Sequence, residues 1–461
     1  MSLSNVPNGH VHHFNGWGQQ TWHALCSVCA PRGVLYPNGP IAMRAKRMNM
    51  KQTWKWLLSA LVVGSLGCNQ HLDVLDTQQD TVGTATEDGI DQVGLTAGKA
   101  DGPFSSCDLA QMLAFANDPR TDKETLKEAG VHARAAGFIP AYRNGLDGIP
   151  GTQDDDIFES AEELDDVIYV GPVAFRQLAA HIAPRCDDIP PPAVEVVFSP
   201  QDYEESHLVQ AMELIHSAKN SIDVAMYSFR DNNLVDALGD AVDRGVTVRL
   251  ISENARKDRT SPEGSVSARL EERGIDVRWV NKIMHHKFCI VDGPQSYEND
   301  PRQGVVMTGS GNWSHSAGTK YDENMVILHG HYEALYTFQK EFELLWDNSR
   351  EFAWNDNIAA RPVTPITEGM LVDNPSFDSG FTSENMRTYI SNAYGPTFGT
   401  LAGSNAVADR WIELIENAQE SIQIASGHLR SRPISEALIA KAVNHPGIQI
   451  QVYLDGQEYI S

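Results

Sequence analysis

The chain has 461 residues, 41% of them hydrophobic and 21% charged, a composition that describes an ordinary globular protein and excludes wholesale disorder. Its 61 acidic residues outnumber 36 Lys and Arg, so the formal net charge is -25 at pH 7. A field of this sign repels phosphate backbones at long range, which disfavours charge-driven wrapping of nucleic acid but still permits a local basic cleft. At roughly 150 residues per domain, the length allows two or three domains.

One hydrophobic stretch lies near the N-terminus, where the apolar residues Leu57 to Leu66 follow a cationic lead and precede Cys68. This run is too short to span a bilayer comfortably, so the pattern predicts a signal peptide over residues 43–67. The ending Ser-Leu-Gly-Cys resembles a bacterial lipobox, in which the cysteine carries lipid. We therefore expect an exported protein, either a cell-envelope lipoprotein held at the membrane through Cys68 or a secreted protein.

Two segments around this signal peptide are predicted to lie outside any folded domain. Residues 1–42 are interpreted as an over-extended N-terminus, because a signal peptide stands near the true start of a chain. Their single CxxC lacks a second pair at zinc-finger spacing, so no metal site is predicted there. Residues 68–106 are rich in Asp, Thr, Gln and Gly without apolar periodicity, which predicts a flexible tether.

Residues 107–186 are predicted to form a small helical domain. Its second half, 161–178, resembles a helix-hairpin-helix unit, although Tyr169 stands where that family usually has its first glycine. Such units often bind DNA through the amides of the hairpin, but the acidic surroundings here favour a packing role. The acidic turn at 143–156 does not match the spacing of an EF-hand loop, so we predict a solvated turn in preference to a calcium site.

The cysteines of the predicted folded part suggest one disulfide. Cys107 and Cys186 bracket the predicted helical domain, and export permits disulfides, so we expect these two cysteines to be bonded. Cys289 falls within an apolar strand and is predicted to be a small, buried core residue.

Beyond the prolines at 190–192 the pattern changes to alternating strands and helices. Strands separated by helices imply a mainly parallel sheet covered on both faces, and therefore an α/β fold. A repeat is also visible, because the motif that begins at Glu213 recurs at Glu413, an offset of 413 − 213 = 200. These patterns predict a first repeat over 192–350, a connection over 351–404 and a truncated second repeat over 405–461.

The segment between residues 285 and 323 holds the candidate chemistry. In an extended strand His285 and Lys287 point to the same side, because side chains alternate with a period of two. Two short apolar strands in this segment end in polar groups at one edge of the predicted sheet, where α/β proteins place their sites. The candidate site residues are His285, Lys287, Asp292, Ser310, Asn312 and Glu323.

These residue types suit attack on phosphorus. A neutral imidazole such as that of His285 is a competent nucleophile near pH 7. Lys287 and Asn312 offer donors to non-bridging phosphate oxygens, and Glu323 is a candidate acceptor from the second nitrogen of His285. The segment holds no cluster of metal ligands, so no cofactor is predicted, and the Lys287 cation takes part of the role that magnesium has elsewhere.

The pattern HxK(x4)D followed by GSxN resembles the signature of the phospholipase D superfamily. The likeness is strong over 195–350, and a broken second copy covers 405–461, which implies a phospholipase D-like α/β/α repeat. By this resemblance His285 is the nucleophile that forms a phosphohistidine, Glu323 orients it, and Asp292 braces the motif. The residues that hold the phosphate are Lys287, Ser310 and Asn312.

The sequence departs from this family in the second repeat, where no HxK motif follows the strand near Val452. Two alternatives account for the departure: the chain is a fragment of a longer protein, or two copies form a homodimer and each donates one motif. We favour the fragment, because a half-built unit that ends in an apolar strand leaves an unpaired, exposed edge.

Three functions are compatible with these residues. The resemblance favours a phosphodiesterase that hydrolyses phospholipid headgroups or transfers them to an alcohol. A nuclease with the same chemistry is the alternative, against which the net charge of -25 argues. The third is a surface binding protein that lacks catalysis because the second motif is absent.

Overall fold

The structure, a computed structural model, describes residues 104–186, 193–352, 358–359, 361–371, 377–390 and 395–456. The predictions for the over-extended N-terminus, the signal peptide, the lipid on Cys68 and most of the tether fall outside these residues. No helix within the described segments combines the length and the apolar character that crossing a lipid bilayer requires.

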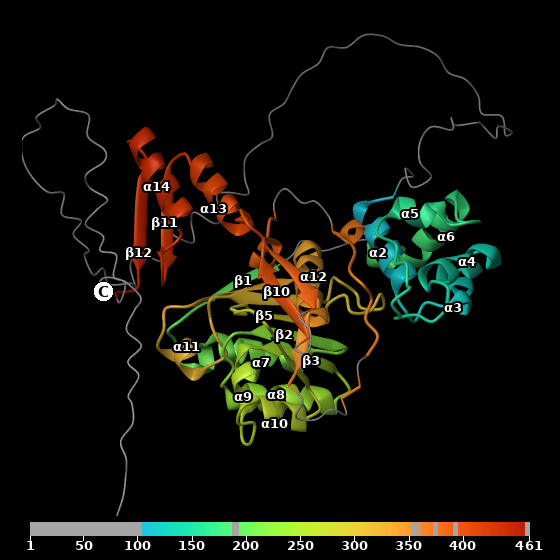
Figure 1. Cartoon of the computed structure of the whole chain (residues 1–461), viewed down its shortest axis with the longest axis horizontal. Coiled ribbons are helices and arrows are strands. Elements are labelled where there is room, and N and C mark those ends of the chain that lie inside the picture. The colour runs from blue at the N-terminus through green and yellow to red at the C-terminus, as the bar shows by residue number, and fades with distance from the viewer. Residues whose placement is uncertain are drawn as a thin grey trace, which may run out of the picture. The chain divides into compact units, whose positions relative to one another are not determined.

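The first described region consists of helices that pack around one apolar core (Figure 1). Ser105 begins the first helix with a capping box, since its hydroxyl accepts from the amide of Asp108 while the Asp108 carboxylate accepts from the amide of Ser105. Phe115, Phe158 and Phe175 are fully buried in the core. The helices are α2 (Ser106–Asn117), α3 (Lys123–Glu128), α4 (Ala133–Arg143), α5 (Ala161–Asp166) and α6 (Pro172–Ile182).

The cysteines follow their sequence-based predictions. A disulfide joins Cys107 and Cys186, whose Cα atoms lie 5.8 Å apart, and it closes a sequence separation of 79 residues. A cross-link over that length restricts the unfolded chain and so stabilises the folded helices. Cys289 is a free thiol with 3% of its surface exposed, as predicted for a small core residue.

The turn between α5 and α6 explains how tyrosine replaces the usual glycine of a helical hairpin. Tyr169 has a φ of 68°, in the left-handed region that glycine prefers. Its ring stays exposed and contacts Phe138 and Arg134.

In the acidic turn, Asp154 accepts from the backbone amide of Leu146. No group of three or more His, Cys, Asp or Glu in the described part of the chain is arranged to hold a metal.

A mixed sheet of eight strands organises the region after residue 193, in the order β1-β7-β6-β5-β2-β3-β4-β8. Its β2–β3 and β3–β4 pairs run parallel, and its other pairs run antiparallel. The α/β fold class is confirmed, but the expectation of a mainly parallel sheet is wrong. The strands β5, β6 and β7 lie antiparallel, an arrangement that needs no crossover of the βαβ kind.

The strands of this sheet are β1 (Ala193–Phe198), β2 (Ser221–Met226), β3 (Thr247–Ser252), β4 (Asp276–Val280), β5 (Lys287–Val291), β6 (Val305–Gly309), β7 (Asn324–His329) and β8 (Ser349–Glu351). The helices of the same region are α7 (His207–Ser217), α8 (Asn232–Asp243), α9 (Glu253–Asp258), α10 (Val266–Glu272), α11 (His315–Thr319) and α12 (Tyr332–Asp347).

Helices cover both faces of the sheet, and strand β5 shows how the sequence directs this (Figure 1). Cys289 and Val291 join the apolar cluster that includes residues of α7, α8 and α10. Phe288 and Ile290 join the cluster on the other face, which includes residues of α12. Because neighbouring side chains of a strand point to opposite faces, a wholly apolar strand feeds two cores at once.

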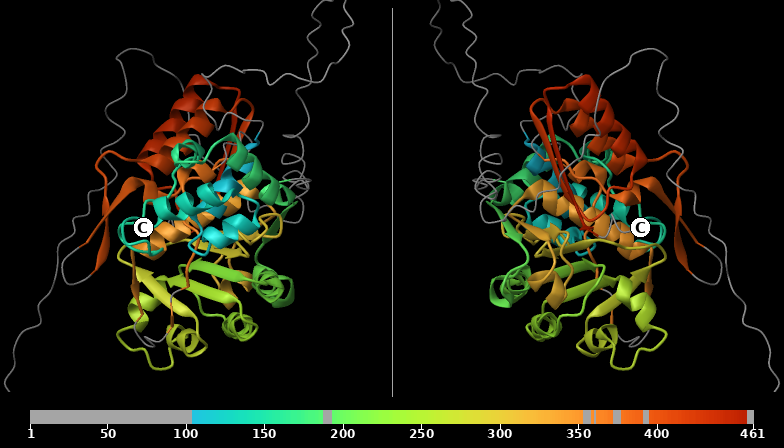
Figure 2. Two further views of the ribbon diagram at one scale, coloured as in Figure 1. Left: turned by 90° about the vertical axis from the view of Figure 1, so that its right-hand side faces the viewer. Right: turned by 90° about the vertical axis from the view of Figure 1, so that its left-hand side faces the viewer.

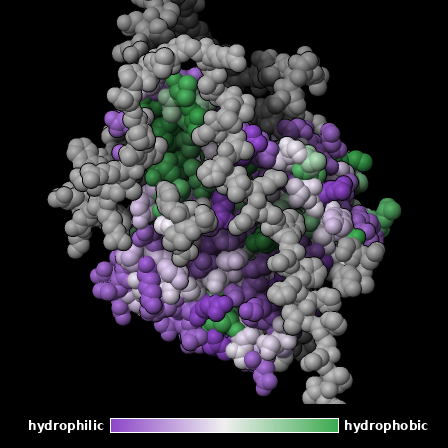
Figure 3. All heavy atoms as spheres, turned by 60° about the vertical axis from the view of Figure 1, so that its left-hand side comes forward, coloured by the Kyte–Doolittle hydropathy of each residue, from purple (hydrophilic) through white to green (hydrophobic). Residues whose placement is uncertain are grey.

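The second repeat forms a smaller unit, in which β11 and β12 make a two-stranded parallel sheet (Figure 2). Figure 3 turns the side that carries these strands toward the reader and shows hydrophobic surface there. Leu414, Ile439 and Val443 are more than 60% exposed in this unit. The C-terminal elements are β9 (Met386–Ile390), β10 (Pro396–Thr400), α13 (Ala406–Asn417), β11 (Ser421–Ser426), α14 (Arg432–Asn444) and β12 (Gln449–Leu454).

Candidate active site

Strand register brings five of the six candidate residues to one edge of the large sheet. In the antiparallel ladders Met226 of β2 pairs with Lys287, and Gly309 of β6 pairs with Met325 of β7. The end of β2, the start of β5, the end of β6 and the start of β7 therefore meet at this edge. The candidate residues at these strand ends are His285, Lys287, Ser310, Asn312 and Glu323.

Asp292 lies at the other end of β5, away from these five residues. It has a φ of 49°, and its carboxylate accepts hydrogen bonds from the backbone amides of Lys219, Asn220 and Ser221. These bonds hold the turn that leads from α7 into β2. The structure thus does not bring Asp292 to the other candidates, and its contacts brace the strand from the far side.

His285 and Lys287 contact each other directly. The Lys287 ammonium lies 3.0 Å from Nδ1 of His285 and also donates to the backbone carbonyl of His285 at 2.6 Å. Burial and the neighbouring Lys287 cation lower the pKa of His285 below its ordinary value, which favours the neutral ring. Tyr227, which follows β2, contacts the His285 ring at a centroid distance of 4.3 Å.

Lys287 is buried, with 6% of its surface exposed. Burial lowers its pKa to about 8, and the nearby Glu323 carboxylate opposes this shift. The Lys287 ammonium also lies 5.1 Å from the centre of the Tyr227 ring, within cation–π range. Sequence reasoning did not identify Tyr227, because its position after β2 carries no motif that distinguishes it.

Glu323 lies beside Ser310 and Lys287. Burial raises the pKa of Glu323, while a hydrogen bond with Ser310 and the charge of Lys287 act in the opposite direction. Among the described contacts, Glu323 makes no hydrogen bond to His285, whose Nδ1 is taken by Lys287. The Ser310 hydroxyl also accepts from the amide of Asn324 at 3.0 Å, which ties the end of β6 to the start of β7.

Asn312 is held from two sides. Its side-chain oxygen accepts from the amide of Ser228 at 3.1 Å, and its carbonyl oxygen lies 3.0 Å from Nε2 of His207. His207 is 1% exposed, and burial lowers its pKa. Because a carbonyl oxygen only accepts, Nε2 of His207 donates to it. A Cβ at Gly311 would lie 3.0 Å from the His207 ring, which explains the glycine. Sequence analysis assigned His207 no role, because the contact joins residues 105 positions apart.

The arrangement combines three chemical capacities at one sheet edge. His285 offers an imidazole whose lowered pKa favours the neutral form, Lys287 a cation of lowered pKa, and Asn312 a fixed amide. A nucleophile placed beside a cation and a neutral donor matches the needs of displacement at a phosphate, where charge on the oxygens must be stabilised.

Comparison with known proteins finds relatives of this segment. Residues 211–346 match the family described as cardiolipin synthase, PLD-like domain. A mitochondrial cardiolipin hydrolase of Xenopus laevis is 30% identical over 176 residues, which cover 36% of this chain and 77% of that protein. The enzyme of the same name from Chlamydomonas reinhardtii is 30% identical over 153 residues, 32% of this chain and 62% of that protein. The chain thus spans less than two thirds of the algal relative.

Among solved structures, a phospholipase D family member named Nuc from Salmonella typhimurium is 30% identical and covers 35% of this chain and 98% of its own, with a TM-score of 0.30.

The relatives overturn the predicted localisation. The curated relatives from algae, insects and vertebrates are all named as mitochondrial enzymes, so the prediction of an exported protein is wrong. The N-terminal pattern does not distinguish export from mitochondrial targeting. A basic segment without acidic residues is common to secretory signals and to mitochondrial transit peptides. The first acidic residue of this chain is Asp73, so the acid-poor lead did not discriminate between the two.

Proposed function

This chain belongs to the phospholipase D superfamily, and on that premise we propose that it is a phosphoric diester hydrolase that cleaves phospholipid headgroups through a phosphohistidine at His285. The observation that carries the proposal is the meeting of His285, Lys287 and Asn312 at one sheet edge. The names of the curated relatives make cardiolipin the first lipid to assay.

The proposed first step uses Lys287 as a mobile partner. Non-bridging oxygens of the bound phosphate attract the Lys287 ammonium away from Nδ1 of His285. The proton of the neutral ring then passes through solvent from Nε2 to the freed Nδ1. Nδ1–H donates to Glu323, which leaves the lone pair of Nε2 for attack on phosphorus. The Nε2–P bond forms, the bond from phosphorus to the headgroup oxygen breaks, and that oxygen takes a proton from water.

The second step releases the product. Water, or an alcohol in a transfer reaction, attacks phosphorus and loses a proton, and the P–N bond to His285 breaks. Lys287 and Asn312 stabilise the oxygens in both steps, because the same charge develops in each direction. In the homodimeric form of this proposal, a second copy of the chain supplies the acid that protonates the leaving headgroup.

The test is to trap the covalent intermediate. Protein mixed briefly with cardiolipin vesicles and quenched in alkali is expected to yield a phosphorylated peptide that contains His285, detected by mass spectrometry. His285→Asn should remove the adduct, whereas His216→Asn, on the exposed face of α7, should keep it. Absence of any adduct together with absence of headgroup release would contradict the proposal.

The same preparation distinguishes the nuclease alternative. Headgroup release from vesicles and nicking of supercoiled plasmid are measured side by side at physiological salt. The net charge of -25 predicts release from lipid without nicking. Nicking without headgroup release would favour a nuclease instead.

A further inference from the structure

A groove of about 470 Å³ opens beside His285 on the face of the sheet that α12 covers. One part of its wall comes from the loop before β5 and from β5, β6 and α12. The other part comes from α13 and from the connection between the two repeats, residues 351–404. Its wall combines apolar and polar side chains. The polar ones besides His285 are Lys282, His286, Thr308, Ser379 and Thr382, and the apolar ones are Ile283, Met284, Phe288, Phe338, Phe381 and Val407.

The basic side chains of this groove, Lys282 and His286, have partners within the protein. The Lys282 ammonium donates to the hydroxyl of Ser383 at 2.5 Å, and that hydroxyl donates to Glu341 at 2.6 Å. His286 lies 2.9 Å from the same Glu341 carboxylate, which is 4% exposed. A chain of phosphates would need cations that can leave their partners, and these side chains are tied into one network.

The aromatic residues of the wall also lack the form of a base-stacking platform. Phe338 meets both Phe288 and Phe381 edge to face, with centroid distances of 5.2 Å and interplanar angles of 82° and 88°. Phe288 and Phe338 are 1% and 7% exposed. Stacked bases require open ring faces, whereas a flexible hydrocarbon needs only apolar surface.

We propose that this groove binds the hydrocarbon part of the substrate, an alkyl or acyl chain of a phosphodiester whose phosphate lies at His285 and Lys287. The inference rests on the proposed function and assigns its substrate class. Two observations support it. The proposed nucleophile His285 itself lines the groove. The basic side chains Lys282 and His286 of the groove are bonded to other protein groups. Each methylene that the groove buries is expected to raise kcat/KM by up to about fourfold.

The test uses p-nitrophenyl phosphodiesters that share one leaving group and differ in the second ester, which is methyl, butyl, hexyl or octyl. Attack on phosphorus releases p-nitrophenolate, and the alkyl group stays on the phosphoryl-enzyme. At concentrations below micelle formation, kcat/KM is expected to rise at least about tenfold from methyl to octyl. Thymidine 5′-p-nitrophenyl phosphate serves as the nucleotide member of the series.

Two variants and two matched controls locate the effect. Ile283→Asp and Val407→Asp are expected to flatten the rise with chain length, because each places a charge beside the hydrocarbon. Ile283 is 74% exposed, so its substitution leaves the cores intact. Ile439→Asp and Val443→Asp make the same changes at exposed residues of α14 and should keep the full rise.

The outcomes separate the inference from the function on which it rests. Release of p-nitrophenolate at one rate for all alkyl chains would overturn the inference while the phosphodiesterase remains. A persistent rise in both groove variants, or faster cleavage of the thymidine ester than of the octyl ester, would also overturn it. Release from none of the esters would overturn the proposed function itself, and this inference with it.

Discussion

The two repeats of the chain contain the same supersecondary unit in different surroundings. In the first, β2 and β3 pair in parallel with Ser221 opposite Thr247, and in the second, β11 and β12 pair in parallel with Ser421 opposite Gln449. The first unit is flanked by further strands, and its β2 is buried throughout. Along β11 exposed and half-buried residues alternate. The two segments thus form the same supersecondary unit, although their described surroundings differ.

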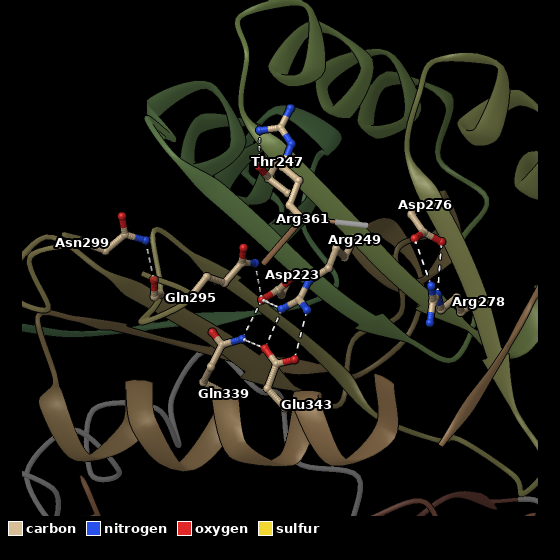
Figure 4. A network of polar contacts seen from close by, with 11 residues as sticks. Asp223, Thr247, Arg249, Asp276, Arg278, Gln295, Asn299, Gln339, Glu343 and Arg361 are labelled. Atoms are coloured by element: carbon tan, nitrogen blue, oxygen red, sulfur yellow. Dashed lines mark hydrogen bonds and ion pairs between the residues drawn. The ribbon is translucent and has the colours of Figure 1, made fainter. Parts of the chain in front are cut away.

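One pair of positions shows what the surroundings change. Asp223 faces Arg249 across β2 and β3 with a salt bridge of 2.7 Å, and Arg249 also binds Glu343 of α12 (Figure 4). At the matching register of the second unit, Gln423 faces Gln451, and their amides lie 3.5 Å apart. A buried position needs every charge paired, whereas an exposed one is satisfied by water, so neutral amides suffice there.

The two repeats also differ in the residues that follow the first strand of the shared unit. The loop after β2 supplies Tyr227 and Ser228, which contact His285 just before β5 and Asn312 just after β6. In the second unit, His428 stands at the position of Ser228, since 428 − 228 = 200. In the first repeat the parallel unit is therefore a scaffold, and the reactive groups lie at the ends of the antiparallel strands that join it.

The largest expected effect separates the reactive groups of the two repeats. His285→Asn should lower kcat for p-nitrophenyl octyl phosphate at least about a thousandfold, because the nucleophile is lost. His428→Asn should leave kcat within twofold of the parent. A loss in the His428 variant comparable to that of His285→Asn would show that the second repeat contributes to catalysis, and the comparison would fail.

The next effect concerns stability at the matched polar pairs. Arg249→Met leaves Asp223 and Glu343 buried without their cation and is expected to lower the free energy of unfolding by about 3–5 kcal/mol. Gln451→Met, at the corresponding exposed position, should change it by less than about 0.5 kcal/mol. Urea unfolding followed by circular dichroism measures both, and equal changes would contradict the difference drawn between the two surroundings.

The smallest effect is a pH dependence that belongs to the first repeat. Attack requires neutral His285, whose pKa is lowered, so kcat/KM should rise with pH through a value below 6.5. Binding of phosphate requires the Lys287 cation, so kcat/KM should fall about tenfold per pH unit above about 8. In Lys287→Arg any remaining activity should lack the alkaline fall, because arginine stays protonated. An alkaline limb that persists in this variant would show that another group titrates there.

Several features of the fold were predictable because their signals are local. Apolar periodicity located the strands around Cys289, and a recurring motif gave the repeat offset of 200. The bracketing positions of Cys107 and Cys186 suggested their disulfide. The mixed direction of the sheet was not predictable in this way, because strand direction depends on which neighbours pair. Spacing in the sequence does not distinguish a crossover from an antiparallel return.

The candidate site likewise has features that its local sequence predicted and features that it did not. The motif placed His285 and Lys287 on one side of a strand, and their contact at 3.0 Å agrees with that expectation. The motif did not show that Asp292 lies at the opposite strand end, or that His207 holds the backbone of Asn312. These features depend on register and on contacts between distant segments.

By itself, the sequence determined the residue types and the elements that carry them: an imidazole and an ammonium two residues apart, an amide after an apolar strand, and a repeated strand–helix–strand unit. Tertiary structure alone decided which strand ends share an edge, which charges are buried, and where an apolar groove meets His285. The physical reason is the distance along the chain over which each effect acts. Periodicity and capping act within a few residues, whereas register, desolvation and groove shape arise when segments far apart in the chain pack together.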